Sequence, residues 1–203
     1  MLNTLSHGVG LVVGLLAGIF LVTYAALFGD GWHLGASITY VTTLIILYLS
    51  STLYHAQKSK ASKRFFKVLD HSAIYLFIAG SYTLVLLTLL KGPMVWVVFG
   101  LQWGIALAGI ILKFVRGANN GILDTAAYLA MGWMCLLILE DLIQIPTGAL
   151  VLIALGGGLY TVGTIFFLLD EKIRYFHSLW HLFVMGGTIS HMVMAFLYII
   201  PSS

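Results

Sequence analysis

The strongest constraint on this chain is a series of long apolar stretches. Six stretches contain no Asp, Glu, Lys or Arg: 8–28, 34–54, 72–90, 93–112, 147–169 and 178–200. A seventh, 122–139, is shorter and holds Asp124 in its first turn, where the helix dipole favours a negative charge. Because about 20 apolar residues in a helix cross the hydrocarbon core, we predict an all-α bundle of seven transmembrane helices.

The composition leaves no room for a separate soluble domain. Apolar residues make up 61% of the chain and charged residues 8%, whereas a soluble domain has roughly 25% charged residues. The mean hydropathy is +1.04. We therefore expect a single membrane domain over 1–203. The one cysteine, Cys135, excludes an intramolecular disulfide and is interpreted as a packing residue. No Lys or Arg precedes the first stretch, so we expect no signal peptide.

The basic residues gather on one side of the predicted bundle. The loops after the second, fourth and sixth stretches hold 9 of the 10 Lys and Arg residues: Lys58, Lys60, Lys63, Arg64, Lys67, Lys113, Arg116, Lys172 and Arg174. Positive charge favours the cytoplasmic side. We predict a cytoplasmic N-terminus, an outside C-terminus and a place in the inner membrane of a bacterium. The basic loop is interpreted as a solvated segment that faces lipid headgroups, so the net charge does not indicate nucleic-acid binding.

Small residues recur every four positions in two of the stretches, and we expect both sets to form helix-packing surfaces: Gly10, Gly14 and Gly18 in the first, and Gly100, Gly104 and Ala108 in the fourth.

Ionisable side chains gather at the predicted cytoplasmic ends of three stretches. His55 ends the second stretch, Asp70 precedes the third, and His177 and His181 lie at the start of the seventh. His177 and His181 are four residues apart, so they share one helix face and can bind one metal ion. Ser51 is placed in the same way four residues before His55. Three imidazoles suit zinc, copper, iron or nickel, and zinc is the usual occupant of a three-histidine site.

The other histidines have simpler interpretations. His7 and His71 are expected to contact lipid headgroups, and His33 to lie at the membrane edge. His191, deep in the last stretch, is expected to form a hydrogen bond between helices. Without a metal, the clustered histidines would also be interfacial hydrogen-bonding residues.

Five short blocks carry a resemblance that covers essentially the whole chain: 6–10 (SHGVG), 51–55 (STLYH), 69–74 (LDHSAI), 80–83 (GSYT) and 177–184 (HSLWHLFV). On these blocks the chain resembles the hemolysin III family, within the progestin and adipoQ receptor group, which in turn resembles the alkaline ceramidases. The resemblance implies seven helices with the N-terminus inside.

The resemblance also implies a metal site. Zinc would be held by His55, His177 and His181, with Asp70 holding a zinc-bound water and Ser51 behind it. The chain lacks the long cytosolic extension of the animal receptors, so hormone recognition is not carried over.

Three functions remain open from the sequence. The first is a zinc-dependent hydrolase of a membrane lipid amide or ester, with a ceramide-like substrate. The second is a non-enzymatic protein of membrane homeostasis or sensing, in which zinc joins the second, third and seventh helices. The third is a hemolysin III-type cytolytic protein; a pore is the least favoured mechanism, because polar residues crowd one face only. The expected partner is membrane lipid, and the oligomeric state stays open.

Overall fold

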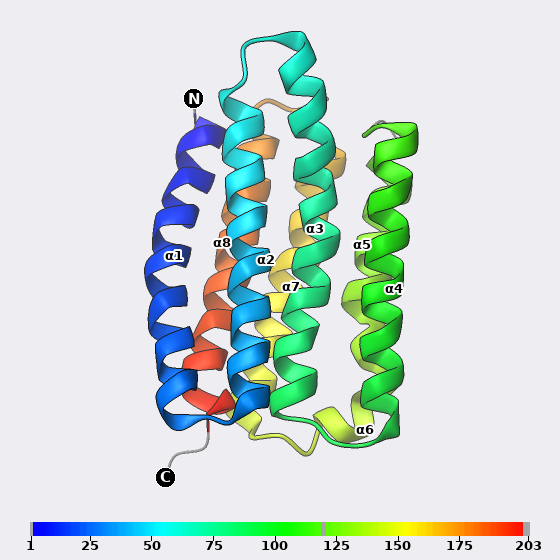
Figure 1. Cartoon of the computed structure of the whole chain (residues 1–203). Coiled ribbons are helices and arrows are strands. Elements are labelled where there is room, and N and C mark those ends of the chain that lie inside the picture. Colours follow the sequence, from blue (N-terminus) through cyan, green and yellow to red (C-terminus); the bar gives the residue numbers. More distant parts are fainter. Residues whose placement is uncertain (1, 119–120, 201–203) are drawn as a thin grey trace.

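The computed structural model describes residues 2–118 and 121–200 of the chain, and every regular element in this part is helical (Figure 1). The elements are α1 (Leu2–Phe28), α2 (Gly31–Ala56), α3 (Lys60–Thr88), α4 (Pro93–Arg116), α5 (Gly121–Gly132), the 3-10 helix η1 (Trp133–Ile138), α6 (Leu139–Leu142), α7 (Thr147–Leu168), α8 (Phe176–Met194) and the π-helical η2 (Ala195–Ile199). Seven helical segments of this part are long and apolar enough to cross a membrane. The predicted all-α seven-helix architecture is confirmed.

Three of the helices begin three or more residues before the apolar stretches that predicted them. α1 begins at Leu2, α2 at Gly31 and α3 at Lys60, and Figure 1 shows the start of α3 projecting beyond the neighbouring helices. The basic segment is mostly exposed, as predicted, but residues 60–67 form the first two turns of α3 and not a loop. A helix satisfies its own backbone hydrogen bonds in water as it does in lipid, so it need not end where the apolar residues end.

The glycine stripe of α1 packs closely against α2, as predicted. A Cβ atom added to Gly10 would lie 2.7 Å from the ring of Tyr48, and Gly14 and Gly18 make similar approaches to Leu44 and Val41. Since side chains of α2 fill the space above each glycine, the two backbones can lie close together. This contact fixes α1 against α2 along most of its length.

The predicted packing surface of α4 is wrong. Gly100, Gly104 and Ala108 are exposed on the outside of the bundle, and a Cβ atom added to Gly100 or Gly104 would meet no neighbour within 4 Å. The helix instead packs through Gly109, which lies against the ring of Tyr75, and through the buried Gln102. Small residues permit close packing but do not require it, and lipid covers this face equally well.

Asp30, at the end of the bundle opposite the N-terminus, caps α2. Its carboxylate accepts hydrogen bonds from the backbone N–H groups of Trp32 (2.8 Å) and His33 (3.0 Å). These bonds, the one from His33 first, hold the pKa of Asp30 below its usual value. His33 lies in the first turn of α2, at the end of the bundle where the sequence placed it.

An ion pair that the sequence did not predict joins α4 to α5. Lys113 was expected in a loop and Asp124 in the first turn of a helix. The two residues are instead 3% and 8% exposed, and their side chains form an ion pair with each other. We expect Lys113→Met to lower the free energy of unfolding by about 3–5 kcal/mol, because it leaves the Asp124 carboxylate buried without a partner. Titration with a denaturing detergent in mixed micelles would measure this loss.

The control for Lys113→Met is Lys172→Met, which makes the same chemical change at an exposed position. The double variant Lys113→Met/Asp124→Leu should recover most of the lost stability, because neither charge is then left alone. Equal stability of Lys113→Met and Lys172→Met would show that the ion pair does not hold α4 to α5.

Candidate metal centre

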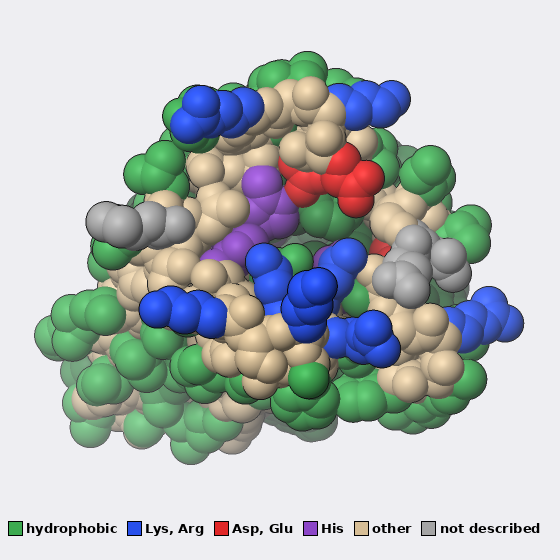
Figure 2. All heavy atoms as spheres, turned by 90° about the horizontal axis from the view of Figure 1, so that it is seen from above, with side chains coloured by type: hydrophobic (Ala, Val, Ile, Leu, Met, Phe, Trp, Pro, Cys, Tyr) green, Lys and Arg blue, Asp and Glu red, His purple; other side chains and the backbone are tan. Residues whose placement is uncertain are grey.

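Three histidines from two helices meet at one end of the bundle. His55 lies at the end of α2, and His177 and His181 lie in the first two turns of α8. One potential ligand atom from each lies within 4.8 Å of the others. Figure 2 shows histidine side chains in a hollow at this end, with Lys and Arg side chains around it. The structure therefore brings together the three histidines that the sequence proposed as ligands.

The three imidazole rings are arranged almost symmetrically. The ring centroids are 4.8 Å apart for His55 and His177, 5.0 Å for His55 and His181, and 4.7 Å for His177 and His181. The angles between ring planes are 66°, 65° and 62° in the same order. The three rings are therefore nearly equidistant, and one potential ligand atom of each lies within reach of a single ion.

His177 is oriented by Asp170, in the connection between α7 and α8. Its Nδ1 lies 2.5 Å from Oδ2 of Asp170, and its Nε2 lies 3.0 Å from Nε2 of His55. Because a carboxylate only accepts hydrogen bonds, Nδ1 of His177 is the donor. In a neutral ring this leaves the Nε2 lone pair free and directed at His55.

Asp170 was not predicted from the sequence to belong to the site. The turn that brings it to His177 contains Tyr175, which caps α8 in a left-handed conformation with φ 71°. Non-glycine residues rarely adopt this conformation, so hydropathy alone does not reveal the turn. A signal was present nevertheless: Asp170 lies seven residues before His177, on the same predicted side of the membrane.

His181 is oriented by Ser6 of α1. Its Nδ1 lies 2.9 Å from Oγ of Ser6, and the Ser6 hydroxyl donates to the backbone carbonyl of Asn3 at 3.1 Å. A hydroxyl has a single proton to donate, so Ser6 must accept the hydrogen bond from Nδ1–H of His181. The Nε2 of His181 is left with its lone pair, as in His177.

These residues fit a zinc ion. In a tetrahedral site with Zn–N bonds of 2.0–2.1 Å, nitrogen ligands lie about 3.3 Å apart; here one pair is separated by 3.0 Å and all three lie within 4.8 Å. Metal-binding histidines usually donate their other N–H to a carboxylate, a carbonyl or a similar acceptor. Asp170 and Ser6 accept such bonds from His177 and His181.

Asp70 and Ser51 lie beside the three histidines but outside their group. Asp70 is a half-buried residue of α3, and the 1%-exposed Ser51 of α2 lies next to its carboxyl group. Among the described residues, the group close enough to share one ion contains only His55, His177 and His181. The catalytic roles of Asp70 and Ser51 stay predictions.

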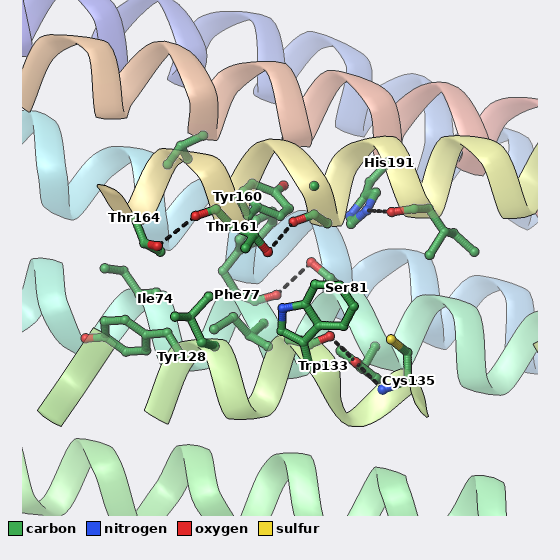
Figure 3. Close-up of a pocket in the computed structure, with 18 of the residues that line it drawn as sticks. Ile74, Phe77, Ser81, Tyr128, Trp133, Cys135, Tyr160, Thr161, Thr164 and His191 are labelled. Carbon is green, nitrogen blue, oxygen red and sulfur yellow. Dashed lines mark hydrogen bonds between the residues drawn. The ribbon is translucent and has the colours of Figure 1, made fainter. Parts of the chain in front are cut away.

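A cavity of about 360 Å³ leads from this site into the bundle, and its lining is mainly apolar. His177, Asp70 and Ser51 line one part, and His191 lines another. His191 follows His177 by 14 residues on α8, and both line the cavity, so it extends about 21 Å along the helix axis. Figure 3 shows His191 and Tyr160 of α7 among the residues that line this space. The sequence analysis did not predict this cavity.

The predicted headgroup contacts of His7 and His71 are wrong. Their exposed fractions are 3% and 7%. Because α1 and α3 begin before the apolar stretches, both residues lie within the bundle. His191 lies 3.4 Å from the backbone carbonyl of Ile153 in α7, so its predicted bond between helices is confirmed.

We expect Asp170→Asn to weaken zinc binding about 10- to 100-fold, because an amide orients and polarises the His177 ring less strongly than a carboxylate does. Competition with a fluorescent chelator would measure the dissociation constant. Glu171→Gln, the same change at the next, exposed residue, is the matched control. Equal affinities of the two variants would contradict a role for Asp170 in metal binding.

The family match and the bacterial relatives of this chain point to the same family. Residues 1–192 match the family described as haemolysin-III related. The chain is 39% identical to the Hemolysin-3 homolog of Bacillus subtilis (strain 168), over 92% of this chain and 87% of that protein. The chain is also 38% identical to Hemolysin-3 of Bacillus cereus, over 99% of this chain and 92% of that protein.

A more distant relative is animal. The Monocyte to macrophage differentiation factor of Homo sapiens is 30% identical, over 80% of this chain and 69% of that protein. No solved structure gives a significant match. With seven apolar helices and bacterial relatives along almost its full length, the chain is a multi-pass integral membrane protein of a bacterium and belongs to the haemolysin-III related family.

Proposed function

We propose that this protein is a zinc-dependent hydrolase that cleaves a membrane lipid amide or ester, with a ceramide-like molecule as the substrate class. One observation carries the proposal. Three histidines close enough to share one ion lie beside a half-buried carboxyl group, and a mainly apolar cavity leads away from them. A hydrolytic site for a lipid needs a metal or base, a proton carrier and a place for an acyl chain, and these features supply all three.

Each residue of the site has a separate role in the proposed hydrolysis. His55, His177 and His181 would hold zinc through their ring nitrogens. When bound, zinc lowers the pKa of a coordinated water to about 7 and polarises a carbonyl group. Asp70 accepts the proton of the attacking water and passes it to the departing amine or alkoxide, as a general base and then a general acid. Ser51 orients the Asp70 carboxyl group.

The cavity supports a lipid as the substrate. Its mainly apolar wall runs about 21 Å from His177 to His191, which suits an acyl chain rather than a polar molecule. The polar part of the lipid would lie at the hollow in Figure 2, among the Lys and Arg side chains. Hydrolysis at the histidines would release a fatty acid from the cavity and the remaining polar part toward solvent.

The alternatives receive less support from the same residues. A structural zinc normally has four protein ligands, and the group found among the described residues has three. A pore needs a polar lining through the membrane, whereas the cavity is lined chiefly by apolar side chains. The word hemolysin in the names of the relatives therefore does not by itself assign a lytic mechanism to this chain.

Lipid hydrolysis by the purified protein tests the proposal. Wild type and His55→Ala would be incubated in mixed micelles with N-acyl amides and matching esters of several chain lengths. Mass spectrometry would measure the release of fatty acid. Metal content by plasma mass spectrometry should give about one zinc per chain in wild type and none in His55→Ala. His33→Ala, a histidine change at the other end of the bundle, is the control. Hydrolysis that persists after the metal is removed would overturn the proposal, as would a folded, zinc-loaded protein that hydrolyses none of these lipids.

A further inference from the structure

His7 occupies an unusual position beside the three-histidine group. It lies on α1, is 3% exposed, and its ring stacks on that of His181 with centroids 3.5 Å apart and planes within 13°. The ring of Tyr48 stands edge-on against its other side, at 5.1 Å and 84°. His7 is therefore packed between two aromatic rings, one of which belongs to a proposed metal ligand.

Both ring nitrogens of His7 lack a hydrogen-bond partner among the described residues. Burying a polar group without a partner is unfavourable, and in folded proteins such a group often has a functional reason. A phenylalanine would stack on His181 equally well and would leave nothing unsatisfied. Stacking alone therefore does not explain a histidine at this position.

His7 is also one of the residues that line the cavity, together with Ser51, Asp70 and His177. A molecule that enters the cavity as far as the histidines therefore meets His7 as well. A neutral imidazole carries one N–H donor and one acceptor. An oxygen atom of that molecule, lying against the three histidines, would satisfy the donor.

We propose that His7 is a substrate-contacting residue, which donates a hydrogen bond to the carbonyl or carboxylate oxygen held beside His55, His177 and His181. This inference rests on the proposed function. His7 does not belong to the group of histidines close enough to share one ion, so its role is distinct from that of the ligands. Its stack on His181 sets its ring at a fixed place relative to that group.

Binding of acetate to the Co²⁺-loaded protein tests this role without relying on turnover. Co²⁺ reports its ligands through visible absorption, and acetate offers a carboxylate oxygen of the required kind. His7→Phe keeps an aromatic ring for stacking and removes both nitrogens. We expect it to bind Co²⁺ with an unchanged spectrum and to bind acetate about 10- to 100-fold more weakly, the effect of one lost hydrogen bond to a charged group.

Two further variants complete the comparison. His7→Asn keeps an N–H donor and should retain most of the acetate affinity. Tyr48→Phe disturbs the packing of the same ring but leaves its nitrogens, because the Tyr48 hydroxyl donates to Thr188 instead; its acetate affinity should equal that of wild type. If His7→Phe does not fold, His7→Leu gives the same comparison with His7→Asn.

The outcomes separate this inference from the proposed function. Equal acetate affinity of wild type and His7→Phe would overturn the role of His7, as would a wild-type protein whose Co²⁺ spectrum does not respond to acetate. A changed Co²⁺ spectrum in acetate-free His7→Phe would also overturn it, because His7 would then be a metal ligand. Failure of folded wild type to bind Co²⁺ or Zn²⁺ would instead overturn the metal site itself.

Discussion

His181→Ala is expected to abolish tight zinc binding and, with it, lipid hydrolysis. A zinc site with four ligands binds with roughly 10–16 kcal/mol, or about 3 kcal/mol for each ligand. Since about 1.4 kcal/mol is a factor of ten, the loss of one imidazole weakens binding at least about 100-fold. His181 is 1% exposed and its Nδ1 bonds to Ser6, so no solvent-exposed side chain can easily replace it.

Metal content and fatty acid release, measured on the same preparation, check this result. His33→Ala should keep both, because His33 lies at the opposite end of the bundle beside Asp30. A His181→Ala protein that is free of zinc yet still hydrolyses the lipid would end the catalytic hypothesis. A protein that keeps one zinc per chain would show that His181 is not a ligand.

Asp70→Asn is expected to keep zinc and lose turnover by about 10²–10⁴-fold, the usual contribution of a general acid–base. An amide cannot accept and return a proton, but it has nearly the same size as the carboxyl group. Because Asp70 lies outside the group of histidines that could share an ion, its replacement should leave metal affinity nearly unchanged. The turnover number and the zinc content per chain are the two measurements.

The same variant separates catalysis from a structural role. If zinc only joins helices and Asp70 is a ligand, Asp70→Asn should lose zinc and stability together. The matched control is Glu140→Gln, which makes the same chemical change at an exposed residue of α6. Wild-type turnover in Asp70→Asn would exclude Asp70 as the proton carrier but would not contradict the metal site.

Much of the architecture could be predicted from hydropathy and charge alone. Lipid offers no hydrogen bonds to the backbone, so each long apolar stretch must be a helix, and seven such stretches determine a seven-helix bundle. Short connections then alternate between the two sides of the membrane. This alternation is why His55, His177 and His181 could be placed at one depth before their contacts were known.

Only the tertiary structure decided which side chains touch. Asp170 meets His177 through the left-handed turn at Tyr175, and His7 meets His181 because α1 begins ahead of its apolar stretch.

The small residues of α4 face outward, while Lys113 of the same helix turns inward to Asp124. Hydropathy describes how deep a residue lies. The rotation of each helix and the space left between helices depend instead on side-chain packing and on hydrogen bonds between distant residues. The cavity that joins the histidines to the bundle interior is a product of that packing.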